Sequence, residues 1–305
     1  MKYILFIIAL FSSLIINAQG VVRRNTNSAS QQPKKATSQV PTKRSRTNIS
    51  SSAPKAFYSN GVLYVNGVSY DMVKVQAGTF IMGANSETKN PYEDEILAHL
   101  VTLTNDYYIG KTEVTQALWK AVTGYSPKSS GSQWEYMYSI GNNYPAYFIS
   151  YNDALSFITQ LNSLTGKTFR LPTEAEWEFA ARGGNKSKGY QYSGSNIIND
   201  VAKFDGNKHL GSPKIGGVFQ VKTKSPNELG LYDMSGNARE WCSDWYGIYS
   251  GASQTDPTGP TSGSSRVIRG GSFLDQARRC NVSGRNYLRP DLCDCTSGFR
   301  LVLSE

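Results

Sequence analysis

Residues 227–242 read Asn227-Glu-Leu-Gly-Leu-Tyr-Asp-Met-Ser-Gly-Asn-Ala-Arg-Glu-Trp-Cys242, and with Arg266-Val-Ile-Arg-Gly-Gly-Ser-Phe273 and the closing Gly298-Phe-Arg300 they decide the fold. Short apolar runs alternate in these stretches with Gly, Asn and Ser, which favour turns. Tyr dominates the 12% of aromatic residues in the chain. This composition predicts a loop-rich α+β domain and argues against a regular helical bundle.

Residues 1–18 have the pattern of an export signal. Lys2 is followed by an apolar run from Tyr3 to Ile16, and Asn17-Ala18 offers a small residue for cleavage. The run is short for a bilayer span, which favours a cleaved signal peptide over an anchor and leaves no membrane span in the mature chain. We therefore expect an exported protein that is periplasmic, at the cell surface or secreted.

Residues 19–56 are predicted to form a disordered basic linker, rich in Ser, Thr and Gln. They contain no acidic residue and few large apolar side chains, so they bury too little surface to offset the entropy of ordering. The linker's eight basic residues and Lys2 account for the whole net charge of +9. Residues 57–305, long enough for one large domain, are therefore near neutral, which excludes nucleic-acid binding by charge.

Local signals predict two hairpins and two helices in this domain. The pairs Asn60-Gly61 and Asn66-Gly67 stand between short apolar runs and indicate tight turns. The stretch Ser150-Tyr-Asn-Asp153 predicts a capped helix that Gly166 ends. The stretch Thr173-Glu-Ala-Glu176 repeats the capping pattern and predicts a second helix.

Several motifs in residues 72–303 resemble the formylglycine-generating enzyme and sulfatase-modifying factor family. Besides the stretches quoted above, they are Val75-Gln-Ala-Gly-Thr-Phe-Ile-Met-Gly83, Ile109-Gly-Lys-Thr-Glu-Val-Thr115 and Arg170-Leu-Pro-Thr-Glu-Ala-Glu-Trp-Glu178. The motifs follow the family's order and spacing, so the resemblance is specific. It implies the family's fold, an irregular, loop-rich formylglycine-generating-enzyme-like α+β domain with C-type-lectin-like topology.

The resemblance also implies a structural calcium site. The family's ligands, which are two side chains and two backbone carbonyls, correspond to Asp233, Gly236, Ala238 and Glu240. Calcium takes six to eight oxygen ligands, and a turn that contains Gly can direct carbonyls inward. The alternative is a turn in which Asp233 and Glu240 only cap backbone amides.

The copper site of the enzymes is where this chain departs from them. The enzymes hold copper with two thiolates five residues apart, and these positions correspond to Asp275 and Cys280. A carboxylate is a poor substitute for a thiolate on copper(I), so the cysteine oxidase reaction and the copper ion are not expected. Arg239 stands where the enzymes carry a Trp that lines the catalytic groove; the alternative is a surface arginine without a role.

The cysteines allow more than one arrangement. Cys280 is predicted to bridge to Cys293 or Cys295, because an exported chain favours disulfides over thiols. Cys242 is expected to pack as a small buried hydrophobe. Cys280 with a non-standard second ligand remains the catalytic alternative. The histidines, His99 and His209, lie too far apart in sequence to suggest an iron site.

The loop from Leu274 to Ser297 is predicted to be a recognition surface for a protein or glycan ligand, because Tyr and Arg among small polar residues are typical of such surfaces. Its candidate contact residues are Asp275, Arg278, Arg279, Asn286, Tyr287, Arg289 and Asp294. The sequence therefore favours an exported, non-catalytic binding or accessory module with a structural calcium. The alternatives are a formylglycine-generating-type oxidase that acts on a protein cysteine and a component of envelope secretion or gliding machinery.

Overall fold

The structure, a computed structural model, describes residues 56–86, 88–126, 134, 139–208 and 217–304. The predicted signal peptide, the predicted linker up to residue 55 and His209 lie outside the described residues. Within the described part, no helix has the length and apolar character needed to cross a membrane.

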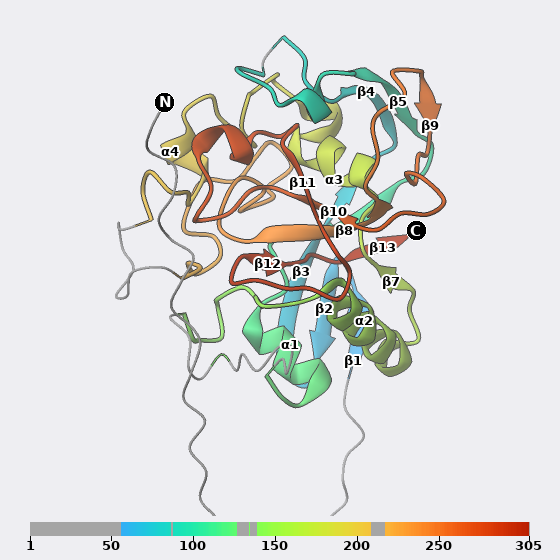
Figure 1. The fold of residues 1–305 in the computed structure, drawn as a ribbon. Helices are drawn as coiled ribbons and strands as arrows, with labels where there is room; N and C mark the ends of the chain where they lie inside the picture. The colour runs from blue at the N-terminus through green and yellow to red at the C-terminus, as the bar shows by residue number, and fades with distance from the viewer. Residues whose placement is uncertain (1–55, 87, 127–133, 135–138, 209–216, 305) are drawn as a thin grey trace, which may run out of the picture. The chain divides into compact units, whose positions relative to one another are not determined.

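Strands make up the first and last parts of the described chain, and the α-helices lie between them in sequence (Figure 1). In chain order they are β1 (Ala56–Ser59), β2 (Val62–Val65), β3 (Val68–Val75), β4 (Gly78–Met82), β5 (His99–Leu103), β6 (Tyr107–Gly110), α1 (Gln116–Thr123), α2 (Tyr151–Thr165), β7 (Phe169–Arg170), α3 (Glu174–Ala181), α4 (Ile198–Val201), β8 (Arg239–Trp245), β9 (Gln254–Thr255), β10 (Arg266–Arg269), β11 (Arg285–Leu288), β12 (Ser297–Gly298) and β13 (Val302–Ser304). Single 3-10 turns occur at Glu93–Glu95, Gly184–Lys186 and Ala277–Cys280.

The strands of the described chain form three sheets. The six-stranded sheet has the order β1-β2-β3-β6-β13-β7, so the C-terminal strand β13 lies between β6 and β7. The four-stranded sheet has the order β11-β10-β8-β12, and the third sheet joins β4, β5 and β9. Helix α1 contacts β2 and β3 of the first sheet and α2 contacts β1 and β7, whereas α3 contacts β4, β8 and β10 (Figure 1). The predicted irregular α+β architecture is confirmed.

Both predicted hairpins are confirmed. Asn60 and Gly61 have φ of 48° and 78°, and Asn66 and Gly67 have φ of 49° and 84°. Two successive positive φ values are those of a type I′ turn, whose twist matches that of the flanking strands. The register pairs Ser59 with Val62 across the first turn.

The predicted helix caps are confirmed as well. The Ser150 and Thr173 side chains accept from the backbone N–H groups of Asp153 and Glu176, and both form reciprocal capping boxes. Gly166 ends α2 in the left-handed conformation at φ 66°. These interactions involve residues three or four apart, which is why the sequence predicts them.

The core contains a buried ionic network around α3 as well as apolar side chains. Arg269 of the Arg-Gly-Gly-Ser motif is fully buried on β10, stacks on Trp177 and forms an ion pair with Glu178 of α3. Glu178 also holds Arg182 at 2.8 Å. Since a buried arginine needs a paired carboxylate, the motif that identifies the family here joins β10 to α3.

Two residues considered in the sequence, Cys242 and His99, are buried. Cys242 is fully buried in an apolar cluster, as expected. His99 is buried on β5, where its Nδ1 lies 3.0 Å from the Leu97 carbonyl and its ring meets Tyr249 edge to face. These contacts give His99 a structural place in the fold.

Candidate functional site

The two positions at which the family resemblance predicts a departure from the enzymes contact each other. Arg239, the first residue of β8, donates to both carboxylate oxygens of Asp275, from Nε to Oδ2 at 2.9 Å and from Nη2 to Oδ1 at 2.7 Å. Asp275 also accepts a 2.7 Å hydrogen bond from the Ser272 hydroxyl, and Asp294 lies 3.5 Å from Arg239. Arg239 is therefore part of an ion pair and not a free surface arginine. Sequence reasoning missed this pair because its members are 36 residues apart.

Asp275 was predicted as a contact residue of the recognition loop. Its side chain is only 12% exposed, and Arg239 occupies both of its oxygens. With the Ser272 hydrogen bond, three of the about four acceptor sites of this carboxylate are used within the protein. The geometry gives Asp275 an internal partner in place of the external one that the sequence suggested.

Cys280 is enclosed beside this pair. It is fully buried and packs with Tyr192 and Val201. Burial, reinforced by the negative charge of Asp275, raises the pKa of the Cys280 thiol well above its usual value. Since the thiolate is the metal ligand and nucleophile, Cys280 is held in its inert form.

Little space remains around Asp275. The small cavity lined by Arg239, Asp275, Gly271 and Asn286 measures about 10 Å³. That volume holds at most about one water molecule. Gly271 lines this cavity and packs closely against Cys280, since a Cβ on residue 271 would lie 2.8 Å from the Cys280 sulfur. The described residues thus leave no room there for a peptide substrate.

All four cysteines are thiols in the structure. Cys280 is buried, whereas Cys293 and Cys295 are partly exposed. The bridge expected from Cys280 to one of them is not formed here, and the pairing stays a prediction.

The turn that would hold calcium is a tight one. Asp233 and Gly236 both have positive φ, 59° and 81°, and a Cβ on Gly236 would lie 2.1 Å from the Lys203 carbonyl. Asp233 is buried and accepts a hydrogen bond from the Lys222 backbone N–H at 2.8 Å. Gly is therefore required at 236, and Asp233 lies near enough to Glu240 for the two carboxyl groups to interact electrostatically.

Glu240 already has protein partners. Arg300 donates to both of its oxygens at 2.6 Å, and Trp177 Nε1 donates to Oε2 at 2.7 Å. A carboxylate has about four acceptor sites, so one site remains for a cation. Glu240 is thus a shared residue of the core and of the candidate calcium site.

Glu113 is a buried carboxylate that sequence reasoning did not single out. Its Oε1 accepts from Asn237 Nδ2 at 3.0 Å, but its buried Oε2 has no hydrogen-bond partner among the described residues. Burial, with the nearby charges of Asp233 and Glu240, raises the pKa of Glu113 well above its usual value. The signal was present in the motif Ile109 to Thr115, which carries this acid into the core.

The charge balance of this region fits a cation. Glu113, Asp233 and Glu240 interact electrostatically, and Arg300 is the cation fully buried among them. Within the described chain, no three acidic, His or Cys side chains converge closely enough to form a metal cluster by themselves. The fit therefore depends on the carbonyls of Gly236 and Ala238 together with Asp233 and Glu240.

The recognition loop meets residues from elsewhere in the chain. Arg278 and Arg279 both stack on Tyr92, at 3.8 Å and 3.4 Å from the ring centroid. Tyr287, which is 53% exposed, packs against Tyr246 with ring centroids 4.3 Å apart. Tyr92 and Tyr246 lie outside the predicted loop, and no pattern in the sequence linked them to it.

A hollow of about 530 Å³ follows these contacts. It is lined by Pro91, Tyr92, Glu93, Asp94, Arg279, Arg285, Asn286 and Tyr287. Arg278, Arg279, Asn286 and Tyr287 therefore share one face. Arg289 instead forms an exposed ion pair with Asp291 at 2.7 Å, and Asp294 lies beside Arg239.

Comparison with known proteins identifies the family to which the chain is similar. Residues 66–305 match the sulfatase-modifying factor enzyme 1-like domain. The chain is 32% identical to the chaperone protein LppX of Paenibacillus barcinonensis, over 78% of this chain and 91% of that protein. It is 36% identical to the formylglycine-generating enzyme of Thermomonospora curvata, over 61% of each chain, and so spans about three fifths of that enzyme.

Solved structures agree on the fold. Treponema denticola variable protein 1 superposes with a TM-score of 0.67 at 31% identity, covering 80% of this chain and 98% of its own. PvdO from Pseudomonas aeruginosa gives a TM-score of 0.66 at 26% identity, covering 77% and 94%. The predicted formylglycine-generating-enzyme-like fold with C-type-lectin-like topology is confirmed, and the chain belongs to the sulfatase-modifying factor enzyme 1-like family.

Proposed function

We propose that this chain is a non-catalytic binding or accessory module of its family, exported from the cell. The observation that carries the proposal is the Arg239–Asp275 ion pair, which occupies the positions of a groove tryptophan and a copper thiolate. Beside it, Cys280 is buried and its neighbouring cavity is too small for a substrate.

The binding surface in this proposal is the hollow lined by Arg279, Asn286 and Tyr287 with Tyr92. Arginine and tyrosine are the residue types that most often dominate binding energy at interfaces. Here stacking preorganises them, since Arg278 and Arg279 share the Tyr92 ring and Tyr287 rests on Tyr246. Preorganised side chains lose less entropy on binding.

We take the ligand to be a protein. The relative that this chain spans almost completely is named a chaperone, and variable protein 1 shares the fold. A hollow that is lined by both acidic and basic groups, Glu93 and Asp94 opposite Arg279, also suits the mixed charges of a polypeptide surface. The envelope-assembly alternative is a special case of this proposal, in which the partner is a machinery component.

Copper(I) titration with oxygen-consumption measurements on a cysteine-containing peptide tests the absence of oxidase activity. We expect no stoichiometric high-affinity copper binding and no oxygen uptake above the peptide-free control. A single tight copper site with turnover would establish the oxidase alternative instead.

The binding surface is tested by affinity capture from envelope extracts, comparing wild type with Arg279→Glu. The control is Arg289→Glu, because Arg289 is exposed in a separate ion pair with Asp291. We expect one partner to be lost with Arg279→Glu and retained with Arg289→Glu. Equal capture by the three proteins would exclude this hollow as the contact surface.

The calcium part of the proposal has its own test. Asp233 and Glu240, with the carbonyls of Gly236 and Ala238, would hold the ion, which would neutralise the buried negative charge of this region. We expect the melting temperature to fall when EDTA is added and to recover with calcium. No change on chelation would argue against the site.

A further inference from the structure

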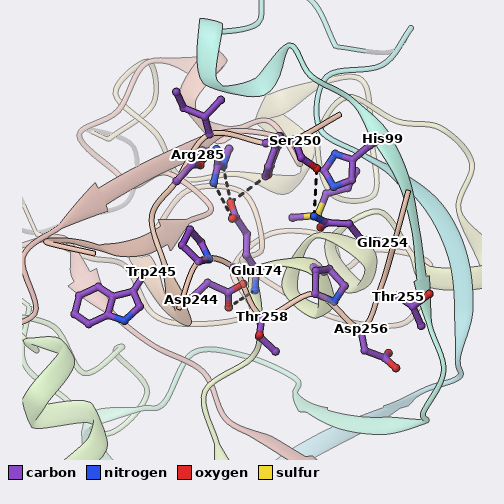
Figure 2. A pocket seen from close by; sticks show the side chains of 18 residues that line it. His99, Glu174, Asp244, Trp245, Ser250, Gln254, Thr255, Asp256, Thr258 and Arg285 are labelled. Atoms are coloured by element: carbon purple, nitrogen blue, oxygen red, sulfur yellow. Dashed lines mark hydrogen bonds and ion pairs between the residues drawn. The ribbon is translucent and has the colours of Figure 1, made fainter. Parts of the chain in front are cut away.

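A cavity at the N-terminal end of α3 lies outside the site described above. It measures about 560 Å³ and is bounded by the N-terminal end of α3, the end of β8, the segment 247–260 and Met82 and His99 (Figure 2). This volume is in the range of small-molecule sites. Neither Arg239, Asp275 nor Cys280 lines it, although Arg285 reaches both regions.

Two buried carboxylates stand side by side in its wall, and only one has a cationic partner. Glu174 receives a bidentate ion pair from Arg285 at 2.7 Å and 2.9 Å. Asp244, only 3% exposed, accepts hydrogen bonds at Oδ2 from the Glu174 backbone N–H and the Ser243 hydroxyl, both at 3.0 Å. Asp244 forms no ion pair with the described residues, and its Oδ1 accepts no hydrogen bond from them. Figure 2 shows both carboxylates among the lining residues.

The electrostatics of Asp244 agree with a missing cation. Burial and the adjacent negative charge of Glu174 raise the pKa of Asp244 to about 7. A third carboxylate, Asp256, also lines the cavity and is engaged by Thr104 alone among the described residues. Glu174 is paired with Arg285 in the lining and also lies 3.5 Å from the buried Arg269. Asp244 is therefore the buried carboxylate of this wall that has no cationic partner among the described residues.

The other residues that line the cavity favour an organic cation over a metal ion. Calcium needs six to eight oxygens, whereas this wall joins one open carboxylate oxygen to hydroxyl and amide groups of Ser250, Thr258 and Gln254. Ile248, Pro257, Pro260 and Met82 supply apolar surface. Such a wall suits a charged head group on a hydrocarbon stem.

We propose that this cavity binds a primary ammonium group on a short apolar stem, with Asp244 as its anionic partner. A free alkylamine and a lysyl side chain of a peptide share this chemistry. The proposal does not depend on the Arg279 hollow or on the loss of oxidase activity.

Calorimetric titration of the full mature chain at pH 8, above the pKa of about 7 of Asp244, tests this site. The probes are n-pentylammonium and Nα-acetyl-lysine amide, and n-pentanol is the uncharged control. We expect saturable binding of at least one ammonium probe with a stoichiometry near one, and none of n-pentanol. A lysine probe that binds while pentylammonium does not would assign a peptide source, and the reverse result a free amine.

Two variants locate the binding within the cavity. Asp244→Asn keeps an acceptor for the Glu174 backbone N–H, and we expect it to weaken ammonium binding at least tenfold. Thr258→Trp narrows the cavity through an exposed lining residue without changing charge, and it should weaken binding as well. Asp291→Asn, at a distant exposed ion pair, should leave affinity unchanged.

Three outcomes would overturn the proposal. They are the absence of saturable binding by either ammonium probe, equal affinity for n-pentanol, or unchanged affinity in both cavity variants. Tight calcium binding that Asp244→Asn removes would assign the cavity to an inorganic cation. Because Thr258→Trp alters an exposed position, it still tests the cavity if Asp244→Asn fails to fold.

Discussion

Breaking the Arg239–Asp275 pair should destabilise the fold by more than breaking an exposed pair of the same chemistry. Arg239 and Asp275 are joined by two hydrogen bonds, and their side chains are 20% and 12% exposed. Arg289 and Asp291 are also joined by two hydrogen bonds, at 3.1 Å and 2.7 Å, but their side chains are 63% and 52% exposed. The two pairs therefore differ in burial, and also in sequence separation, which is 36 residues for the first and two for the second.

The expected magnitude follows from this burial. Hydrogen bonds to charged groups contribute about 1.5–3 kcal/mol each when desolvated, and exposed ion pairs much less. Since both side chains keep some solvent contact, we expect a coupling free energy of roughly 1–2 kcal/mol for the Arg239–Asp275 pair. Single replacements should lower the melting temperature by about 2–6 °C in a domain of this size.

A double-mutant cycle measures this coupling. The variants are Arg239→Gln, Asp275→Asn and both together, with Arg289→Gln and Asp291→Asn as the matched exposed cycle, each unfolded in urea. We expect clear coupling in the first cycle and none that can be measured in the second. Equal coupling in the two cycles would refute the argument that the replaced catalytic positions form a structural pair.

Three further predictions concern buried groups. In the folded protein the pKa of Asp244 is raised to about 7, whereas an unfolded aspartate releases its proton near pH 4. The free energy of unfolding should therefore fall as the pH rises between these values. Thermal unfolding at pH 5 and pH 8 should show a smaller difference in melting temperature for Asp244→Asn than for wild type. Gly271→Ala should destabilise by about 2–4 kcal/mol in urea titrations, because φ is 69° and the new Cβ would lie 2.8 Å from the Cys280 sulfur; an unchanged midpoint would show that the Cys280 enclosure is loose. Glu113→Gln replaces a buried carboxyl group, whose pKa is raised well above its usual value and whose Oε2 lacks a hydrogen-bond partner in the described chain, with a neutral amide. A nearby calcium ion would favour the ionised carboxyl, so the variant should reduce the calcium-induced rise in melting temperature while leaving stability in EDTA equal or higher. The full rise in the variant would exclude Glu113 from the calcium region.

The local parts of the fold could be predicted from the sequence because their interactions span few residues. The Asn66-Gly67 turn and the Thr173 capping box each involve residues within one turn. Their side-chain chemistry specifies the backbone geometry directly. The order of the strands in the sheets could not be predicted in this way. Strand β13 lies between β6 and β7, and no local pattern in the sequence encodes that placement.

The candidate site could be predicted only as a set of positions. Motif spacing located Asp275 and Cys280, but the partner of Asp275 is Arg239, which belongs to a different motif. Likewise, Tyr92 is brought under Arg279 by the tertiary fold. Contacts between residues far apart in sequence depend on packing of the whole domain, and a single sequence without that packing does not specify them.

The chemistry of the replaced positions indicates a rebuilt site more than a decayed one. An arginine in place of a tryptophan would, by itself, place a charge in a partly desolvated position, and an aspartate in place of a cysteine would do the same with the opposite sign. Such charges are costly unless they are paired, and here each satisfies the other. Ser272 of the Arg-Gly-Gly-Ser motif adds a third contact to Asp275. Because Arg239 begins β8 and Asp275 precedes the turn that carries Arg278 and Arg279, the pair joins the start of the proposed recognition loop to the four-stranded sheet. The region that supports copper chemistry in the enzymes would then hold a binding surface in place.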